Sequence, residues 1–248
     1  MKSYNTFRKL DRNVFTLIEL LVTISIIAIL ASMLLPALKR SREKAKEIQC
    51  VSNIRQCIMG SFQYAEDYHG LAPSSYLFPY SVSGPNGSVN GDEVRWAGML
   101  YILAYVSNKD IFICPNDLGV AKSIYPVWSM PRIQVLTYGM TYNYSSTPTS
   151  LAGFTSIYKQ DDPSRRILLA DSVYYMTWSS VNKWVPTSNI TKYDGAASAD
   201  IDRVVYLKHF GKSSAAYMDG HAAGAKAENF RQSGILGGRN QNLLPVAF

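Results

Sequence analysis

Histidine and cysteine, which often act as catalytic groups or metal ligands, are scarce in this chain: it has three of each among 248 residues. One histidine stands out, because nine residues separate His209 from the dipeptide Asp219-Gly220. A histidine and an aspartate that meet in the fold could act as a general base with its orienting carboxylate, or as two ligands of one metal ion. Whether they meet depends on the strands that carry them.

Residues 203–210 and 213–218 are predicted strands, and their pairing would keep His209 and Asp219 apart. A two-residue turn at Gly211-Lys212 pairs the residues on either side of it: Phe210 with Ser213, His209 with Ser214, and Val204 with Asp219. His209 and Asp219 would then lie roughly 17 Å apart along the ladder, too far for a dyad or a shared metal. We therefore interpret Asp219-Gly220 as the turn of the next hairpin, with His221 beginning the following strand.

The three cysteines lack the spacing of a zinc site, and there is no Cys-x-x-Cys pair. Cys50 and Cys57 lie seven residues apart on a predicted helix, about 10 Å, which is too far for a disulfide between them. Either of them could reach Cys114 if that segment packs on the helix. Catalytic motifs are missing as well: the sequence has no nucleophile-elbow serine, phosphate-binding loop, zinc-protease motif or dinucleotide fingerprint.

A run of 21 residues from Phe15 to Leu35 is apolar apart from one charge, Glu19. As a helix it would be about 30 Å long, the thickness of a bilayer core, whereas a cleaved secretory signal has a shorter apolar segment. Basic clusters lie on both sides, in residues 1–14 and 39–47, and contribute to the net charge of +7. Basic residues that flank one apolar run indicate a membrane partner and no nucleic acid.

Glu19 does not fit a plain membrane anchor. A carboxylate deep in lipid costs roughly 2–3 kcal/mol or more, and such residues are usually functional. A cation delivered within the membrane would relieve this cost, and another chain is the natural donor.

The segment Val14-Phe15-Thr16-Leu17-Ile18-Glu19-Leu20-Leu21 resembles the signal shared by type IV pilins and type II secretion pseudopilins. The resemblance implies cleavage between Val14 and Phe15 by a prepilin peptidase, N-methylation of Phe15, and a role for Glu19 in filament assembly. Pro36 falls at position 22 of the trimmed chain, where this family often has a proline that kinks the helix. Val14 stands where the family normally has glycine. The spacing of His209 and Asp219-Gly220 also resembles a C-terminal motif of some prepilin-like proteins.

The same resemblance implies a single-pass protein of the bacterial inner membrane whose globular domain faces outward. An outward domain meets oxidising conditions, and we favour a Cys50–Cys114 disulfide that leaves Cys57 buried. Major pseudopilins bind calcium in a loop before their last strands. Here Asp194, Asp200 and Asp202 form an acidic loop, but their loose spacing favours a solvated loop over a calcium site.

The remaining pattern predicts an α+β fold, in which one long helix over residues 15–68 packs on a mostly antiparallel sheet. Its second half carries an apolar face at helical spacing: Ala45, Ile48, Val51, Ile54, Ile58, Phe62 and Ala65. We expect loops over 73–95 and 182–202, a helix over 96–106, a strand or turn over 111–115, and strands over 135–144 and 166–172. The domains would be a leader (1–14), a transmembrane and assembly helix (15–38), an amphipathic helix (39–72) and a globular domain (73–248).

The sequence therefore favours a structural subunit of a type IV pilus-like or type II secretion filament, without a cofactor and without enzymatic activity. Its partners would be copies of itself, the prepilin peptidase and methylase, membrane lipid, and an inner-membrane assembly platform with its ATPase. The filament would lie in the periplasm or at the cell surface. The alternative is a membrane-tethered outward binding module that never polymerises, and a tethered enzyme is a more distant third.

Overall fold

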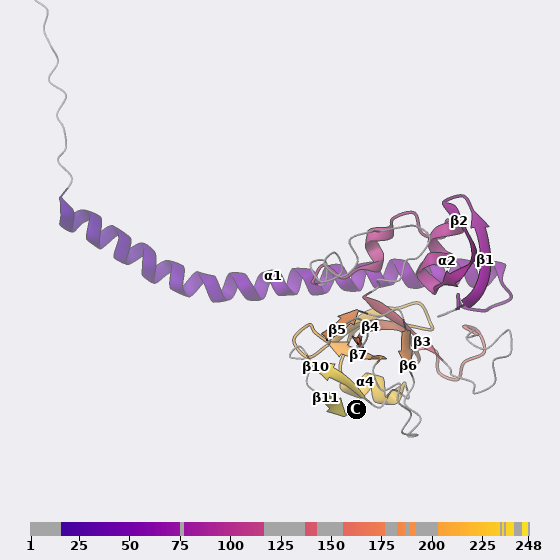
Figure 1. Cartoon of the computed structure of the whole chain (residues 1–248). Coiled ribbons are helices and arrows are strands. Elements are labelled where there is room, and N and C mark those ends of the chain that lie inside the picture. Colours follow the sequence, from indigo (N-terminus) through magenta and orange to yellow (C-terminus); the bar gives the residue numbers. More distant parts are fainter. Residues whose placement is uncertain are drawn as a thin grey trace, which may run out of the picture. The chain divides into compact units, whose positions relative to one another are not determined.

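The computed structural model describes residues 16–74, 77–116, 137–142, 156–176, 183–186, 189–191, 203–233, 235, 237–240 and 245–247 (Figure 1). The fold is α+β, with a long N-terminal helix and mostly antiparallel sheets, as predicted. The elements follow in this order: α1 (Leu17–Asp67), β1 (Leu77–Gly84), β2 (Gly87–Val94), α2 (Trp96–Ile102), the 3₁₀ helix η1 (Lys109–Phe112), β3 (Tyr138–Tyr142), β4 (Ile167–Met176), β5 (Lys183–Pro186), β6 (Asn189–Thr191), β7 (Arg203–Leu207), β8 (Ser213–Tyr217), β9 (Ala222–Ala225), α4 (Ala227–Gln232), β10 (Gly237–Asn240) and β11 (Pro245–Ala247).

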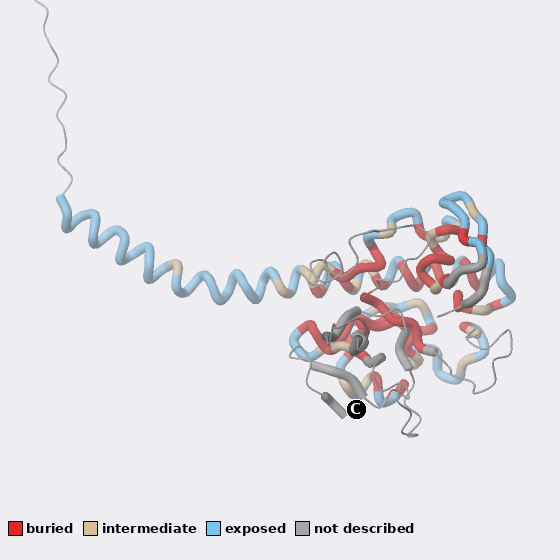
Figure 2. The backbone as a smooth tube through the Cα atoms, viewed as in Figure 1, coloured by how far each residue is buried: buried red, intermediate tan, exposed pale blue. Residues whose placement is uncertain are grey.

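The chain divides into two compact units, residues 1–43 and 44–248. In the first unit, the large apolar residues of α1 between Leu17 and Leu38 are each 50–88% exposed. Figure 2 accordingly colours this part of the backbone as exposed over nearly its whole length. This part of α1 is long and apolar enough to cross a membrane. Pro36 lies inside the helix. An exposed apolar surface of this extent is typical of a helix that lipid or other apolar helices surround.

In the second unit, one face of α1 is buried against the globular domain. Its buried positions recur at helical spacing: Glu47, Cys50, Ile54, Cys57, Ile58, Gly60, Ser61, Tyr64 and Ala65. The predicted face was correct at Ile54, Ile58 and Ala65 but wrong at Ala45 and Ile48, which are both exposed. The buried face therefore includes Cys50 and Cys57, which the predicted apolar face did not contain.

Strand β4 is the centre of a nine-stranded sheet. It pairs antiparallel with β3, β5, β7 and β8, and among the described strands only the β3–β6 and β7–β10 pairs are parallel. The register slips between Ile167 and Leu169. Leu168 and Leu169 consequently both join the core cluster that includes α1, whereas Ile167 joins a second cluster with Phe230 of α4.

Two loop predictions were wrong. Residues 73–95 contain the β1–β2 hairpin, in which Gly84 opposes Gly87 across the turn. The hairpin forms despite its many glycines and serines because Val82, Val89 and Val94 are buried against the core. Residues 182–202 include β5 and β6, which pair with β4 and β3. The segment over 111–115 begins within η1 and has no strand.

The tip of the β1–β2 hairpin is fixed to the end of α2 by hydrogen bonds. The backbone N–H of Asn86 donates to the Ile102 carbonyl at 3.2 Å, and its side-chain amide donates to the Tyr101 carbonyl at 2.9 Å. A side chain on Gly84 would overlap the Ile102 carbonyl group. The close approach of the two backbones therefore requires glycine at this position.

We expect Gly84→Ala to lower the free energy of unfolding of the full-length protein by about 1–3 kcal/mol, because the added methyl group overpacks a backbone contact. Chemical denaturation in detergent, followed by tryptophan fluorescence, would measure the loss. Ser83→Ala is the control, since Ser83 is an exposed neighbour in the same strand. Equal stability of the two variants would contradict the close contact.

Candidate functional site

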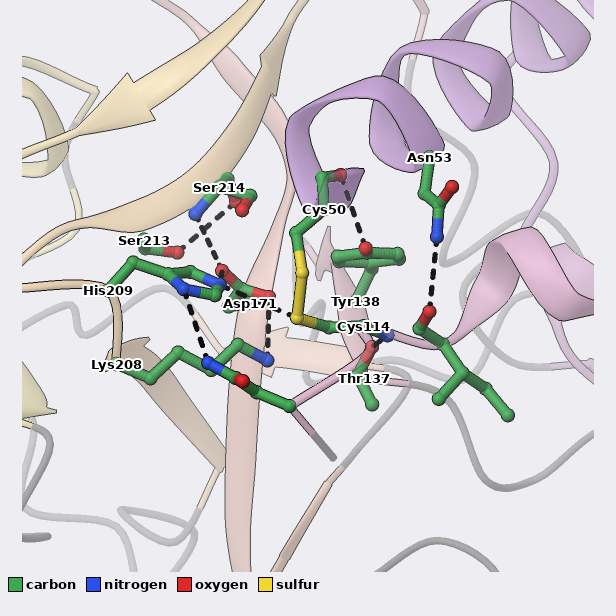
Figure 3. Close-up of a disulfide and its surroundings, with 12 residues drawn as sticks. Cys50, Asn53, Cys114, Thr137, Tyr138, Asp171, Lys208, His209, Ser213 and Ser214 are labelled. Carbon is green, nitrogen blue, oxygen red and sulfur yellow. Dashed lines mark hydrogen bonds and ion pairs between the residues drawn. A yellow bond between two sulfur atoms is a disulfide. The ribbon is translucent and has the colours of Figure 1, made fainter. Parts of the chain in front are cut away.

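Among the described residues, a group of reactive side chains lies where four segments of the globular domain meet (Figure 3). Helix α1 contributes Cys50, the segment after η1 contributes Cys114, strand β4 contributes Asp171, and the turn after β7 contributes Lys208 and His209. All five side chains are buried. We call this group the cysteine–histidine centre.

A disulfide joins Cys50 to Cys114, with 5.1 Å between their Cα atoms. These are the two cysteines that the sequence favoured. The backbone on both sides is held by hydrogen bonds: the Tyr138 hydroxyl donates to the Cys50 carbonyl at 3.2 Å, and the Cys114 N–H donates to the Thr137 hydroxyl at 2.5 Å. Cys57 is a buried free thiol, and burial raises its pKa.

The imidazole of His209 packs against this disulfide. Its Nε2 lies 3.4 Å from Cys114 Sγ, and its Nδ1 lies 3.4 Å from Nδ2 of Asn116. If the Asn116 amide donates to Nδ1, the imidazole proton is on Nε2 and points at the sulfur. The motif histidine thus contacts the crosslink between α1 and the segment after η1.

Asp171 and Lys208 form an ion pair with almost no exposure to solvent. Lys208 Nζ lies 2.9 Å from Asp171 Oδ1, and the two side chains are 4% and 0% exposed. The other carboxylate oxygen accepts the Ser214 N–H at 2.6 Å and lies 3.9 Å from His209 Nε2. Buried charges of this kind remain charged only when they are paired and hydrogen-bonded.

The turn that presents His209 differs from the predicted one. His209 bridges Lys212, so Phe210 and Gly211 form the turn, with φ of 52° and 76°. Two positive φ values are typical of a type I′ turn, which usually selects glycine or asparagine at both positions. The predicted turn at Gly211-Lys212 was one residue too late, because Phe210 takes a conformation that its type rarely adopts.

Strands β7 and β8 also do not form the predicted hairpin. Both run antiparallel to β4, which places Val204 opposite Val173 and not opposite Asp219. The turn at Phe210-Gly211 therefore connects two strands that each pair with β4 and do not form a hairpin with each other. This turn places the side chain of His209 in the core.

The prediction of a hairpin turn at Asp219-Gly220 is confirmed. The turn joins β8 to β9, and Gly220 has a φ of 92°. Asp219 Oδ1 accepts the backbone N–H of His221 at 3.1 Å and lies 2.6 Å from its Nδ1. His209 and Asp219 thus lie in different surroundings, one buried beside the disulfide and the other in a partly exposed turn. The structure does not bring the two motif residues together as a dyad.

At the N-terminus of α1, Glu19 makes contacts that the sequence analysis missed. Its Oε2 accepts hydrogen bonds from the Thr16 N–H and the Thr16 hydroxyl, both at 2.8 Å, and its own N–H donates to Thr16 Oγ1 at 3.3 Å. This reciprocal pattern is a capping box, and its Thr-x-x-Glu spacing is visible in the sequence. Val14, Phe15 and the acidic loop of Asp194, Asp200 and Asp202 lie outside the described residues.

No family model, no curated protein and no solved structure shows significant similarity to this chain. The cysteine–histidine centre crosslinks two segments through its disulfide, and its buried side chains present no exposed nucleophile among the residues that the structure describes.

We expect Lys208→Met to destabilise the protein by about 3–5 kcal/mol, because it leaves the buried Asp171 carboxylate without a counter-charge. The double variant Asp171→Asn/Lys208→Met removes both charges and keeps an acceptor for the Ser214 N–H, so most of the lost stability should return. Denaturant unfolding of the full-length protein checks both values. The control is Lys212→Met, at a partly exposed position in the same turn. A Lys208 variant no less stable than this control would contradict the buried ion pair.

Proposed function

We propose that this protein is a pilin-like subunit that assembles into a filament through the apolar half of α1. The observation that carries the proposal is an exposed apolar helix surface between Leu17 and Leu38, joined in one continuous helix to a folded domain. A membrane can cover this surface in the single subunit. The same surface of other copies can cover it in a filament, where apolar helices pack side by side.

Glu19 supports the proposal because it is the one acidic side chain in the apolar run. The capping box satisfies hydrogen bonds of the carboxylate but does not neutralise its charge, since Thr16 is uncharged. In the proposed filament the methylated amine of Phe15 from a neighbouring copy, which stays positively charged, pairs with Glu19. Such a pair sets the register between subunits as well as contributing energy.

The path that we propose for the protein is the one implied by the resemblance of the segment from Val14 to Leu21 to the pilin signal. A prepilin peptidase removes residues 1–14 and methylates Phe15, and an assembly platform with its ATPase extracts the subunit from the bacterial inner membrane. The domain lies outside the cytoplasm, and the Cys50–Cys114 disulfide favours this side because disulfides persist under oxidising conditions. A type II secretion filament and a type IV pilus-like filament both fit this path.

The variant Glu19→Gln separates the capping role from the assembly role. Glutamine keeps the hydrogen bonds of a capping box but has no charge. We expect Glu19→Gln to reach the membrane at normal levels and to reduce the yield of sheared filaments by at least about tenfold, the factor that 1.4 kcal/mol represents. Immunoblots of membrane and sheared fractions measure both quantities.

Thr16→Val is the matched control, since it removes the capping partner and leaves the Glu19 charge in place. We expect this variant to assemble. The proposal would be refuted by the reverse result, in which Glu19→Gln forms filaments normally and Thr16→Val does not. Glu19 would then serve only the end of its own helix.

Processing of the leader distinguishes the filament subunit from a tethered binding module. We expect mass spectrometry of the purified protein to find a mature chain that begins with N-methylated Phe15 and lacks residues 1–14. The same analysis of a strain without prepilin peptidase serves as the unprocessed control. A wild-type chain that retains its whole leader would instead support the tethered module.

A further inference from the structure

We propose that the cysteine–histidine centre binds one zinc ion when Cys50 and Cys114 are reduced, with His209 and Asp171 as the other two ligands. The centre would then hold its segments together in either of two chemical states, a disulfide or a zinc site. This inference concerns the globular domain alone and does not rest on filament assembly.

The positions of the donor atoms support a metal site. Cys50 Sγ, Cys114 Sγ and a ring nitrogen of His209 all lie within 4.8 Å of one another. Asp171 Oδ2 lies 3.9 Å from His209 Nε2, which in turn lies 3.4 Å from Cys114 Sγ. Bonds of about 2.3 Å to sulfur and 2.0 Å to nitrogen or oxygen place tetrahedral ligands roughly 3.3–3.8 Å apart. Once the disulfide opens, its sulfurs need to separate by only roughly 2 Å to fit this geometry.

The charges of the centre also fit a divalent cation. In the disulfide form, the Asp171 carboxylate and the Lys208 ammonium balance each other. Reduction followed by loss of two thiol protons adds two negative charges, and one Zn²⁺ ion cancels them. Since the centre is buried, a state with no net charge costs far less than two thiolates alone.

Neighbouring groups are placed to orient the proposed ligands. Lys208 and the Ser214 N–H each contact one oxygen of Asp171, and Asn116 contacts Nδ1 of His209. To bind zinc through Nε2, His209 must carry its proton on Nδ1. Rotation of the Asn116 amide by half a turn would place its oxygen there as the acceptor. Partners of this kind commonly fix the tautomer and orientation of a metal-bound histidine.

The donor types favour zinc over harder ions. Thiolates and imidazole select zinc and related soft metals, whereas calcium and magnesium prefer oxygen ligands. Opening the disulfide takes two electrons and two protons. A dithiol supplies both and becomes a disulfide itself, whereas a phosphine supplies the electrons and becomes its oxide while water supplies the protons and the oxygen. Zinc binding then releases two protons from the resulting thiols. The site has no sequence signature, because its four ligands come from four separate segments.

The test uses the full-length protein in detergent. One sample is reduced with a phosphine under anaerobic conditions in mild denaturant, and the denaturant is removed in the presence of zinc sulfate. A second sample is treated identically without reductant. After desalting, we expect about one zinc per chain in the reduced sample and none in the disulfide sample, measured by elemental mass spectrometry. Bound zinc should also protect two of the three thiols from alkylation.

His209→Ala is expected to weaken zinc binding by at least about tenfold, whereas Cys57→Ala and His221→Ala leave it unchanged. Cobalt substitution of the wild-type protein gives a readout that does not depend on any variant folding. A thiolate-to-cobalt charge-transfer band with tetrahedral d–d absorption would support the site. Folded, reduced wild-type protein that binds no stoichiometric zinc, or a cobalt spectrum without sulfur ligation, would overturn it.

Discussion

The Asp171 carboxylate is the constraint on which the globular domain depends most. It lies in the central strand β4, opposite Tyr138 of β3, and is fully buried. One oxygen faces the Lys208 ammonium and the other accepts the Ser214 N–H, so a single side chain connects β4 to the turn after β7 and to β8. The cost of burying this charge is recovered only if these segments take their native positions. His209 is thereby held against the disulfide that joins α1 to the rest of the domain.

Much of this fold could be predicted because it follows hydrophobic periodicity. The long helix, α2, β3, β7 and β8 each overlap a predicted element, and the boundaries of α1 differ from the prediction by one or two residues. These segments carry apolar residues at a spacing that local geometry dictates. The turn at Asp219-Gly220 was predictable for a related reason, since Gly220 adopts a positive φ that few other residues tolerate. At these positions the local sequence was sufficient to predict the structure.

Other features depended on contacts that no local pattern reveals. The β1–β2 hairpin has a loop-like composition, and it is fixed by the hydrogen bonds between Asn86 and the end of α2. The turn after β7 was misplaced because Phe210 adopts a positive φ, and the pairing of β7 and β8 with β4 brings His209 inward. The cysteine–histidine centre combines residues up to 159 positions apart, from Cys50 to His209. These residues come close together only through the topology of the fold.

Glu19 illustrates how one residue can meet two demands. The first N–H groups of a helix lack partners within the helix, and the capping box satisfies two N–H groups at this end. The Glu19 carboxylate accepts the Thr16 N–H, and the Thr16 hydroxyl oxygen accepts the Glu19 N–H. A glutamine would do this equally well without the cost of placing a charge among apolar side chains. Capping therefore explains why position 19 carries a hydrogen-bond acceptor, but it does not explain why that acceptor is charged. A negative charge near the start of the helix also interacts favourably with the helix dipole, but only by about 0.3–1 kcal/mol, less than the cost of burying it in lipid. If the helix lies in a membrane as proposed, a cation would offset the remaining cost, and a neighbouring amine in the proposed filament would supply that cation.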